Sequence, residues 1–253
     1  MTNKLIYFIG NWKMFGNLNS SRIIDQIDAF CKKYSKYQKK YKVILCVPNT
    51  LIYYFSNKIR SNSVSIGAQN CHYNINFGPH TGSVNAGMLK NVGAKYIILG
   101  HSENRLEGEK DQEIRKKIES AIKEKLNIIF CIGETAKEKR NGKTFSVLKN
   151  QLNNSIFKIK NIDKIIIAYE PRWSIGSGKI PKVSEISRIF SFIKKELKSN
   201  IKTQKSNYVL YGGSISGKNI NMFSTITDVD GFLIGGSSQS SKKFIDIIKN
   251  YYK

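Results

Sequence analysis

The chain has 253 residues, of which 40% are apolar and 24% are charged, and its formal net charge is +24 at pH 7. This length is typical of one α/β barrel, and the apolar share suffices for a large core. Because no apolar run approaches about 18 residues, we expect no membrane-spanning helix. The N-terminus lacks a cleavable signal pattern, and the widely spaced cysteines include no C-x-x-C pair. These features favour a reducing cytoplasm over a disulfide framework or a metal site.

The strong positive charge would ordinarily suggest a nucleic-acid partner. However, 35 lysines and 7 arginines make up the 42 basic residues, whereas the forked contacts that read bases and phosphates favour arginine. The lysines are also scattered over nearly every predicted helix rather than gathered in one stripe. We therefore expect no nucleic-acid partner, although a positive field would help to steer an anionic substrate.

Short apolar runs recur along the chain, with amphipathic segments between them. The runs predict eight strands, at residues 5–10, 43–47, 64–69, 96–100, 127–132, 164–169, 207–211 and 230–234. Apolar residues spaced three to four apart predict helices that include 22–27, 111–125, 144–159, 184–198 and 241–250. Strands that alternate with helices pair in parallel, and eight such units in about 250 residues predict a closed (β/α)8 barrel. We expect residues 1–253 to form a single domain.

An open, doubly wound sheet is the alternative architecture. Such a sheet would carry a G-x-G-x-x-G motif after its first strand, whereas Gly10 is followed by Asn11, Trp12 and Lys13.

Residues 70–84 show no clear periodicity. A long irregular connection inside a compact domain is usually functional or docked elsewhere.

Charged side chains follow three of the predicted strands at their C-terminal ends. Lys13 follows the first strand, His101 the fourth and Glu170 the sixth. In a parallel barrel these ends meet at one face, where active sites lie. An acid such as Glu170, beside a loop that can close, suits general-base catalysis in a pocket that excludes water.

Glycine-rich segments follow the sixth, seventh and eighth predicted strands. The stretch 171–181 is stiff at its start, with Pro171 and Trp173, and rich in glycine at its tip, which predicts a hinged lid. Two glycine turns, at 212–213 and 235–236, expose backbone N–H groups that suit a phosphate.

Nine segments, taken in chain order, resemble the triosephosphate isomerase family. They are 11–14 (Asn-Trp-Lys-Met), 67–70 (Gly-Ala-Gln-Asn), 81–82 (Thr-Gly), 100–103 (Gly-His-Ser-Glu), 131–134 (Cys-Ile-Gly-Glu), 168–171 (Ala-Tyr-Glu-Pro), 175–179 (Ile-Gly-Ser-Gly-Lys), 211–214 (Tyr-Gly-Gly-Ser) and 230–236 (Asp-Gly-Phe-Leu-Ile-Gly-Gly). One tetrapeptide alone is a weak signal, but together, at these intervals, the segments are specific.

The resemblance implies interconversion of dihydroxyacetone phosphate and glyceraldehyde 3-phosphate without a cofactor or a metal. It implies that Glu170 is the base, that His101 polarises the carbonyl as a neutral imidazole, and that Lys13 holds the substrate and offsets charge on the enediolate. The substrate-binding residues that it implies are Asn11, Lys13, Gly176, Ser214, Gly235 and Gly236. The supporting residues that it implies are Glu103 and, from a partner subunit, Thr81.

The resemblance also implies a homodimer formed through loop 70–84. In the family, a Glu usual at position 83 pairs across the interface with an Arg usual at position 104; here Ser83 and Asn104 replace both. Two further departures are Arg172, where an aliphatic hinge residue is usual, and Gln239, where Leu is usual.

We expect His101 to stay neutral across about pH 5–8. Ser102 and Glu103 are predicted to begin a short helical turn, and the N–H groups at such an N-terminus disfavour a charged imidazole.

Two other functions remain open. The first is another phosphosugar enzyme on the same barrel, since one fold hosts many chemistries. That enzyme would need a Schiff-base lysine inside a strand or a set of metal-binding carboxylates, and neither is evident. The second is a catalytically weak barrel that acts as a lysine-rich binding protein. An isomerase assay beside a salt series for nucleic-acid retention would separate these functions.

Overall fold

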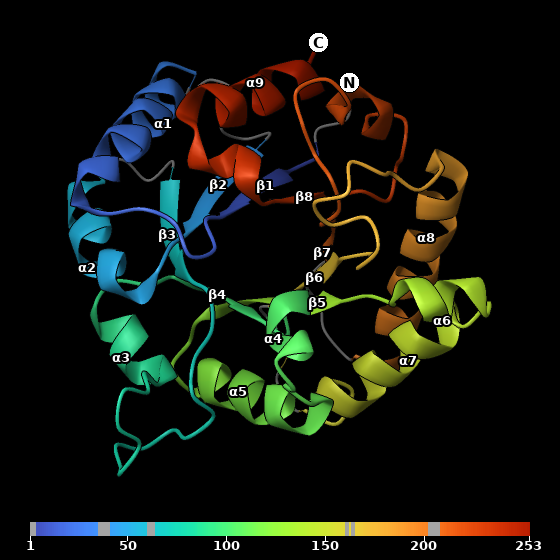
Figure 1. Cartoon of the computed structure of the whole chain (residues 1–253), viewed down its shortest axis with the longest axis horizontal. Helices are drawn as coiled ribbons and strands as arrows, with labels where there is room; N and C mark the ends of the chain where they lie inside the picture. Colours follow the sequence, from blue (N-terminus) through green and yellow to red (C-terminus); the bar gives the residue numbers. More distant parts are fainter. Residues whose placement is uncertain (1–3, 35–40, 60–63, 160–161, 163–164, 202–207) are drawn as a thin grey trace.

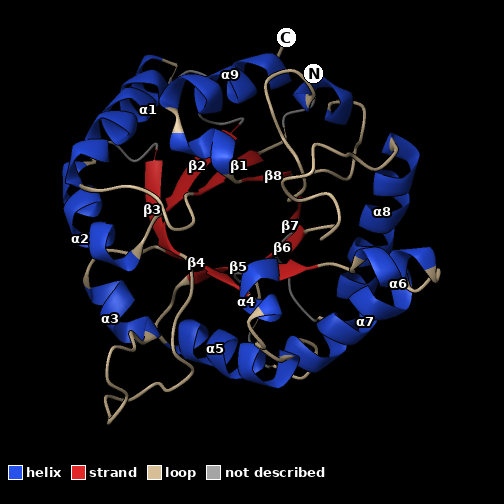
Figure 2. Cartoon of the chain, in the orientation of Figure 1, coloured by secondary structure: helices blue, strands red, loops and turns tan. Residues whose placement is uncertain are grey.

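The computed structural model describes residues 4–34, 41–59, 64–159, 162, 165–201 and 208–253. Eight parallel strands among these residues close into one barrel, in which each strand pairs with the next along the chain and the last pairs with the first. The strands form the centre of the molecule, and helices surround them (Figure 1, Figure 2). The closed (β/α)8 barrel expected from the sequence is therefore confirmed.

All eight predicted strands are present. They are β1 (Ile6–Asn11), β2 (Tyr41–Cys46), β3 (Val64–Ala68), β4 (Tyr96–Leu99), β5 (Asn127–Ile132), β6 (Ile165–Tyr169), β7 (Tyr208–Tyr211) and β8 (Gly231–Ile234). Residues 164 and 207, which were predicted to begin two of these strands, lie outside the described residues. The other predicted bounds differ from the observed ones by two residues at most.

The described helices are α1 (Ser21–Lys33), α2 (Asn49–Lys58), α3 (Ala86–Asn91), α4 (Ser102–Leu106), α5 (Asp111–Lys123), α6 (Ala136–Arg140), α7 (Thr144–Ser155), α8 (Val183–Asn200) and α9 (Ser241–Tyr251). The five segments predicted as helices correspond to α1, α5, α7, α8 and α9, although α5 and α7 end before the predicted residues. Between β7 and β8 the chain forms the 3-10 turn η3 (Ile220–Phe223) instead of an α-helix. Within the described part of the chain, none of the helices combines the length and the apolar character needed to cross a membrane.

Alternate strand residues belong to two different apolar cores. In β6, Ile166 and Ala168 belong to the cluster that fills the barrel, together with Ile9 of β1. Their neighbours Ile167 and Tyr169 belong to the larger cluster between the barrel and the helices. Because both faces of each strand are buried, the strands are nearly continuous apolar runs in the sequence.

Residues 70–84, between β3 and α3, form no helix and no strand beyond a single bridge from His72 to Asn85. The segment extends outward from the ring of helices (Figure 1). It carries Phe77, whose exposed fraction is 86%.

One buried acid joins several elements at the N-terminal end of the barrel. Asp230, just before β8, accepts a hydrogen bond from the N–H of Val209 in β7 at 2.8 Å. Its carboxylate also forms ion pairs with Lys4, before β1, at 2.7 Å and with Lys194, in α8, at 3.1 Å. Asp230 therefore ties β7, β8, α8 and the segment before β1 together.

We predict that Asp230→Ala lowers the free energy of unfolding by about 1–3 kcal/mol, because the buried N–H of Val209 loses its acceptor. The control is Asp25→Ala, since Asp25 forms an exposed ion pair with Lys58. That change is expected to cost at most about 1 kcal/mol. Urea unfolding at one protein concentration measures both variants, and equal losses would contradict the role given to Asp230.

Candidate active site

A cavity of about 420 Å³ lies at the C-terminal ends of the strands. This volume is typical of small-molecule sites. The predicted site residues that line it are Asn11, Lys13, His101, Glu170, Gly176, Ser214, Gly235 and Gly236. The barrel therefore brings together side chains and turns that are spread over most of the sequence.

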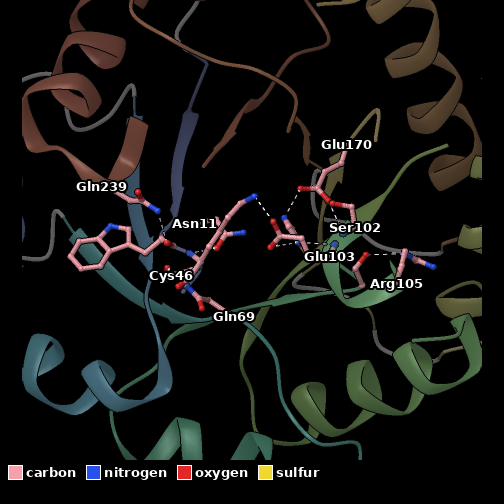
Figure 3. A network of polar contacts seen from close by, with 12 residues as sticks. Asn11, Cys46, Gln69, Ser102, Glu103, Arg105, Glu170 and Gln239 are labelled. Carbon is pink, nitrogen blue, oxygen red and sulfur yellow. Dashed lines mark hydrogen bonds and ion pairs between the residues drawn. The ribbon is translucent and has the colours of Figure 1, made fainter. Parts of the chain in front are cut away.

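Glu170 and His101 face each other in this cavity. Glu170 Oε1 lies 3.2 Å from His101 Nε2, and Glu170 Oε2 accepts a hydrogen bond from the N–H of Ser102 at 3.2 Å. Both side chains are buried. Figure 3 shows the Glu170 carboxylate directed at the first turn of α4, which carries Ser102 and Glu103.

The position of Glu170 follows from close packing of two strand ends. Its N–H donates to the carbonyl of Ile132 at the end of β5, at 2.8 Å. The next residue is Gly133, and a Cβ atom built there would lie 1.8 Å from the carbonyl oxygen of Glu170. Residue 133 must therefore be glycine for the backbone of Glu170 to lie this close to β5.

The protonation of the two facing groups is coupled. Burial alone would raise the pKa of Glu170, but the charge and hydrogen bond of His101, the N–H of Ser102 and the charge of Lys13 lower it, and the net shift is downward. Burial alone would lower the pKa of His101, but Glu170 and then Glu103 raise it, and the net shift is upward. Each group thus favours the charged form of the other in the free protein.

The upward shift in the pKa of His101 runs against the expectation that this ring stays neutral, whereas Nδ1, as an acceptor, fits the neutral ring. The helix N-terminus is present as predicted, because the N–H of Glu103 donates to His101 Nδ1 at 3.3 Å. The expectation missed the carboxylate at the other ring nitrogen. The distance between the ends of β4 and β6 has no signature in the sequence.

Lys13 has an unusual backbone conformation. Its φ of 56° lies in the left-handed region, which is uncommon for residues other than glycine. Its N–H donates to Asn11 Oδ1 at 3.0 Å, and its carbonyl accepts a hydrogen bond from Gln69 Nε2 at 3.0 Å. The ammonium Nζ lies 2.5 Å from Glu103 Oε1. Glu103 is half-exposed and lies beside the cavity rather than in its lining.

The part of the cavity wall that follows β7 and β8 is rich in glycine. Residues 212–214 follow β7, and residues 235–236 follow β8. Ser214 Oγ donates to the carbonyl of Ser174 at 2.7 Å, which links this wall to the segment 171–181. Gly176, at the tip of that segment, has a left-handed φ of 68°. Glycine is therefore favoured at the point where the segment turns toward the cavity.

The segment 171–181 is anchored at its start by a buried carboxylate. Glu134 accepts hydrogen bonds from Trp173 Nε1 at 2.9 Å and from the hydroxyl of Tyr169 at 3.2 Å. Burial raises the pKa of Glu134, and these hydrogen bonds only partly offset that rise. The ammonium of Lys139 lies 3.9 Å from the centre of the Trp173 ring. Trp173 is thus held on both sides.

Some lining residues were not among the predicted site residues. They include Ile175, Gly178, Gly212, Gly213, Ile215, Ser216, Asn219, Leu233 and Ser237. All of them except Asn219 lie within these segments (175–179, 211–214 and 230–236) or at most two residues from one, and this proximity is the signal that could have identified them. The predicted residue Thr81 lies outside the cavity, exposed on loop 70–84. Among the residues that the structure describes, no three His, Cys, Asp or Glu side chains are grouped so as to hold a metal ion.

We predict that NMR titration of His101 in the free protein gives a midpoint above its ordinary value of about 6.5. Glu170→Gln should lower this midpoint, because the main group that raises the pKa of His101 is removed. His72 is an internal control: burial, His80 and Lys117 lower its pKa, and none of these changes in the variant. Equal midpoints for His101 in the two proteins would contradict the coupling.

Comparisons with known proteins agree with this fold. The family model for triosephosphate isomerase matches residues 6–251. The chain is 37% identical over 242 residues to the triosephosphate isomerase of Bradyrhizobium diazoefficiens, with 95% of each chain covered. It is 38% identical over 248 residues to that of Yarrowia lipolytica, covering 96% of this chain and 98% of the relative.

A solved structure gives the same result. The crystal structure of triosephosphate isomerase from Bartonella henselae superposes with a TM-score of 0.87 at 32% identity, covering 98% of this chain and 99% of that one. The match extends over the whole barrel and includes the strand ends that form the cavity. The chain therefore belongs to the triosephosphate isomerase family.

Proposed function

We propose that the chain interconverts dihydroxyacetone phosphate and D-glyceraldehyde 3-phosphate in this cavity, as an isomerase of glycolysis and gluconeogenesis. The whole chain, residues 1–253, acts as one catalytic domain. The observation that carries the proposal is the buried Glu170 carboxylate, 3.2 Å from His101 Nε2 in a cavity that Lys13 also lines. A base, a hydrogen-bond donor and a positive charge thus converge on a space that fits a triose phosphate.

Glu170 is the base in this proposal. It takes a proton from the carbon next to the substrate carbonyl, and the C–H electron pair becomes the double bond of an enediolate. The carbonyl electron pair moves onto oxygen, where His101 Nε2 and Lys13 Nζ stabilise the charge. The hydroxyl proton on the first carbon passes to the former carbonyl oxygen, and Glu170 returns its own proton to the neighbouring carbon, so that no atom is gained or lost.

Substrate binding changes the balance between Glu170 and His101. In the free protein the charge of His101 is the main influence that lowers the pKa of Glu170. A substrate that lies between the two groups weakens this interaction, and burial then favours the protonated carboxyl. Glu170 becomes a stronger base at the moment when a proton is to be taken.

The phosphate of the substrate binds to the glycine turns in this proposal. Ser214, Gly235 and Gly236 supply N–H groups, Gly176 contributes from the segment 171–181, and Asn11 contacts the substrate from β1. The segment 171–181 acts as a lid, which excludes water from the enediolate. The Glu134–Trp173 hydrogen bond supports this assignment, because it fixes one hinge and leaves the glycine tip free to close.

We predict that Glu170→Gln lowers turnover by at least about 10²–10⁴-fold, because the amide cannot accept the proton. Glu119→Gln on α5 is the matched control, since Glu119 contacts Arg115 on the helix surface. The control should keep its turnover. A coupled assay for both directions of the isomerisation measures each protein, and circular dichroism checks the fold. Turnover near that of the parent protein in Glu170→Gln would remove the base assignment.

We also propose that the chain acts as a homodimer, without nucleic acid or membrane as a partner, in the cytoplasm. The outward extension of loop 70–84 and the exposure of Phe77 and Met14, at 86% and 101%, support the dimer. In this assembly Thr81 supports the partner's site. The four buried cysteines, none of which forms a disulfide among the described residues, support a reducing compartment.

We expect that both partners of one interface ion pair have been replaced together, by Ser83 and Asn104. Ser83→Glu alone should weaken the dimer or leave it unchanged, because it adds one unpaired charge. Ser83→Glu combined with Asn104→Arg should stabilise the dimer more than the sum of the two single changes, with a coupling free energy of about 0.5–3 kcal/mol. Sedimentation of the four proteins at several concentrations measures dissociation. Additive effects would show that the two positions do not meet, and a monomeric parent protein would contradict the dimer itself.

A further inference from the structure

Lys13 keeps its left-handed backbone because hydrogen bonds fix the peptide units on both of its sides. A residue with a β-carbon keeps such a conformation where its surroundings determine it. The peptide unit between Trp12 and Lys13 sets φ of Lys13. Its N–H donates to Asn11 Oδ1 at 3.0 Å, and its carbonyl, that of Trp12, accepts from Gln239 Nε2 at 2.8 Å. With both polar ends bonded, this plane cannot turn without breaking a hydrogen bond.

The peptide unit after Lys13 sets ψ, and a second glutamine holds it. Gln69 Nε2 donates to the carbonyl of Lys13 and to that of Cys46, each at 3.0 Å. Figure 3 shows Gln239 and Gln69 reaching the segment of Asn11 from two sides. Gln69 follows β3, whereas Gln239 ends the 3-10 turn η4 (Gly236–Gln239) that follows β8. The conformation of Lys13 thus depends on two other strand ends.

The turn that carries Gln239 also carries part of the glycine wall. Ser238 donates its N–H to the carbonyl of Gly235 at 2.8 Å, which closes the turn. A Cβ atom built on Gly235 would lie 3.6 Å from Lys13 Cε, so the side chain of Lys13 runs alongside this turn. Gln239 therefore connects the backbone of Lys13 to the same turn that borders its side chain.

The carbonyl that Gln239 holds belongs to a well-fixed residue. Trp12 is fully buried, and its ring packs edge-on against Phe55 with 5.6 Å between ring centres. Its N–H donates to the carbonyl of Cys46 at 3.0 Å. Since Trp12 cannot move away, its carbonyl stays within reach of Gln239.

We propose that Gln239 is a positioning residue that sets the backbone of Lys13, and through it the ammonium group, from the turn after β8. This inference rests on the proposed function of Lys13. It also gives a role to one of the positions at which the chain departs from the usual residue of its family. A leucine at this position could not donate a hydrogen bond to the carbonyl of Trp12.

Two substitutions and one control test the proposal. Gln239→Leu removes the donor, and kcat/KM should fall about three- to tenfold, as expected for one lost hydrogen bond. Gln239→Glu keeps the shape but directs an acceptor at the carbonyl of Trp12, and kcat should fall further at neutral pH, by about 10–100-fold for a displaced catalytic group. The control is Asn127→Leu, because Asn127 Nδ2 also donates to a carbonyl, that of Lys95, at 2.9 Å, but at the other end of the barrel.

The pH profile separates positioning from a general loss of stability. The acid form of residue 239 in Gln239→Glu has an O–H that can donate to the carbonyl of Trp12. The ratio of kcat in Gln239→Glu to kcat in the parent protein should therefore rise as the pH falls, while the ratio for Gln239→Leu stays constant. Asn127→Leu should keep the parent kcat at every pH.

NMR of the free protein gives a readout that does not depend on activity. The ¹³Cα and ¹³Cβ shifts of Lys13 report its backbone conformation and should move in Gln239→Glu and Gln239→Leu but not in Asn127→Leu. Unchanged Lys13 shifts, with kcat/KM within about twofold of the parent, would overturn the positioning role and leave the proposed function intact. Lys13 shifts that move while turnover stays at the parent level would overturn the catalytic role of Lys13, and the inference with it.

Discussion

The contact between the Glu170 carboxylate and the His101 ring is the constraint on which the site depends. A carboxylate this deeply buried must be paired or hydrogen-bonded, because an isolated buried charge is too costly. Three groups compensate Glu170 in the free protein: the ring of His101, the N–H of Ser102 and, from farther away, the charge of Lys13. The same groups are those that an enediolate would need. The resting site is therefore stabilised by the interactions that substrate is proposed to redirect.

The barrel fixes where the strand ends lie, and the loops then fix the side chains. Both faces of each strand are buried, so a strand cannot slide without exposing apolar residues on one side or overpacking the other. The close approach of Gly133 to Glu170 shows how little freedom remains at these ends. Beyond the strands, single hydrogen bonds fix the positions of loop residues. Examples are the bond from Trp173 to Glu134 and the bond from Gln239 to the carbonyl of Trp12. Precision in the site thus comes from a rigid frame with a few polar contacts added to it.

The features that could be predicted from the sequence are those for which burial requires apolar residues. Strands buried on both faces are apolar runs, and Lys13, His101 and Glu170 follow such runs immediately, so fold and chemistry could be predicted together. The helices α3 and α6, of six and five residues, were not predicted, because they contain too few turns to show periodicity. The ten-residue helix α2 was also missed. The upward shift in the pKa of His101 was not predicted, because it depends on a distance across the cavity. The contact of Gln239 with Trp12 joins residues 227 positions apart, and no local pattern marks it.

The site consists of two groups of residues, and the barrel fixes their positions relative to each other. Glu170 and His101 stand on the ends of β6 and β4, whereas Lys13, Gly235 and Gln239 surround the seam where β8 pairs with β1. Asp230 ties this same seam together at the opposite end of the strands through its ion pair with Lys4. Weakening of the seam would displace Lys13 from the glycine turn and leave the Glu170–His101 pair in place. The pairing of β1 with β8 joins two distant parts of the sequence. A change that weakens this pairing would therefore lower the stability of the barrel and also the stabilisation of negative charge in the cavity.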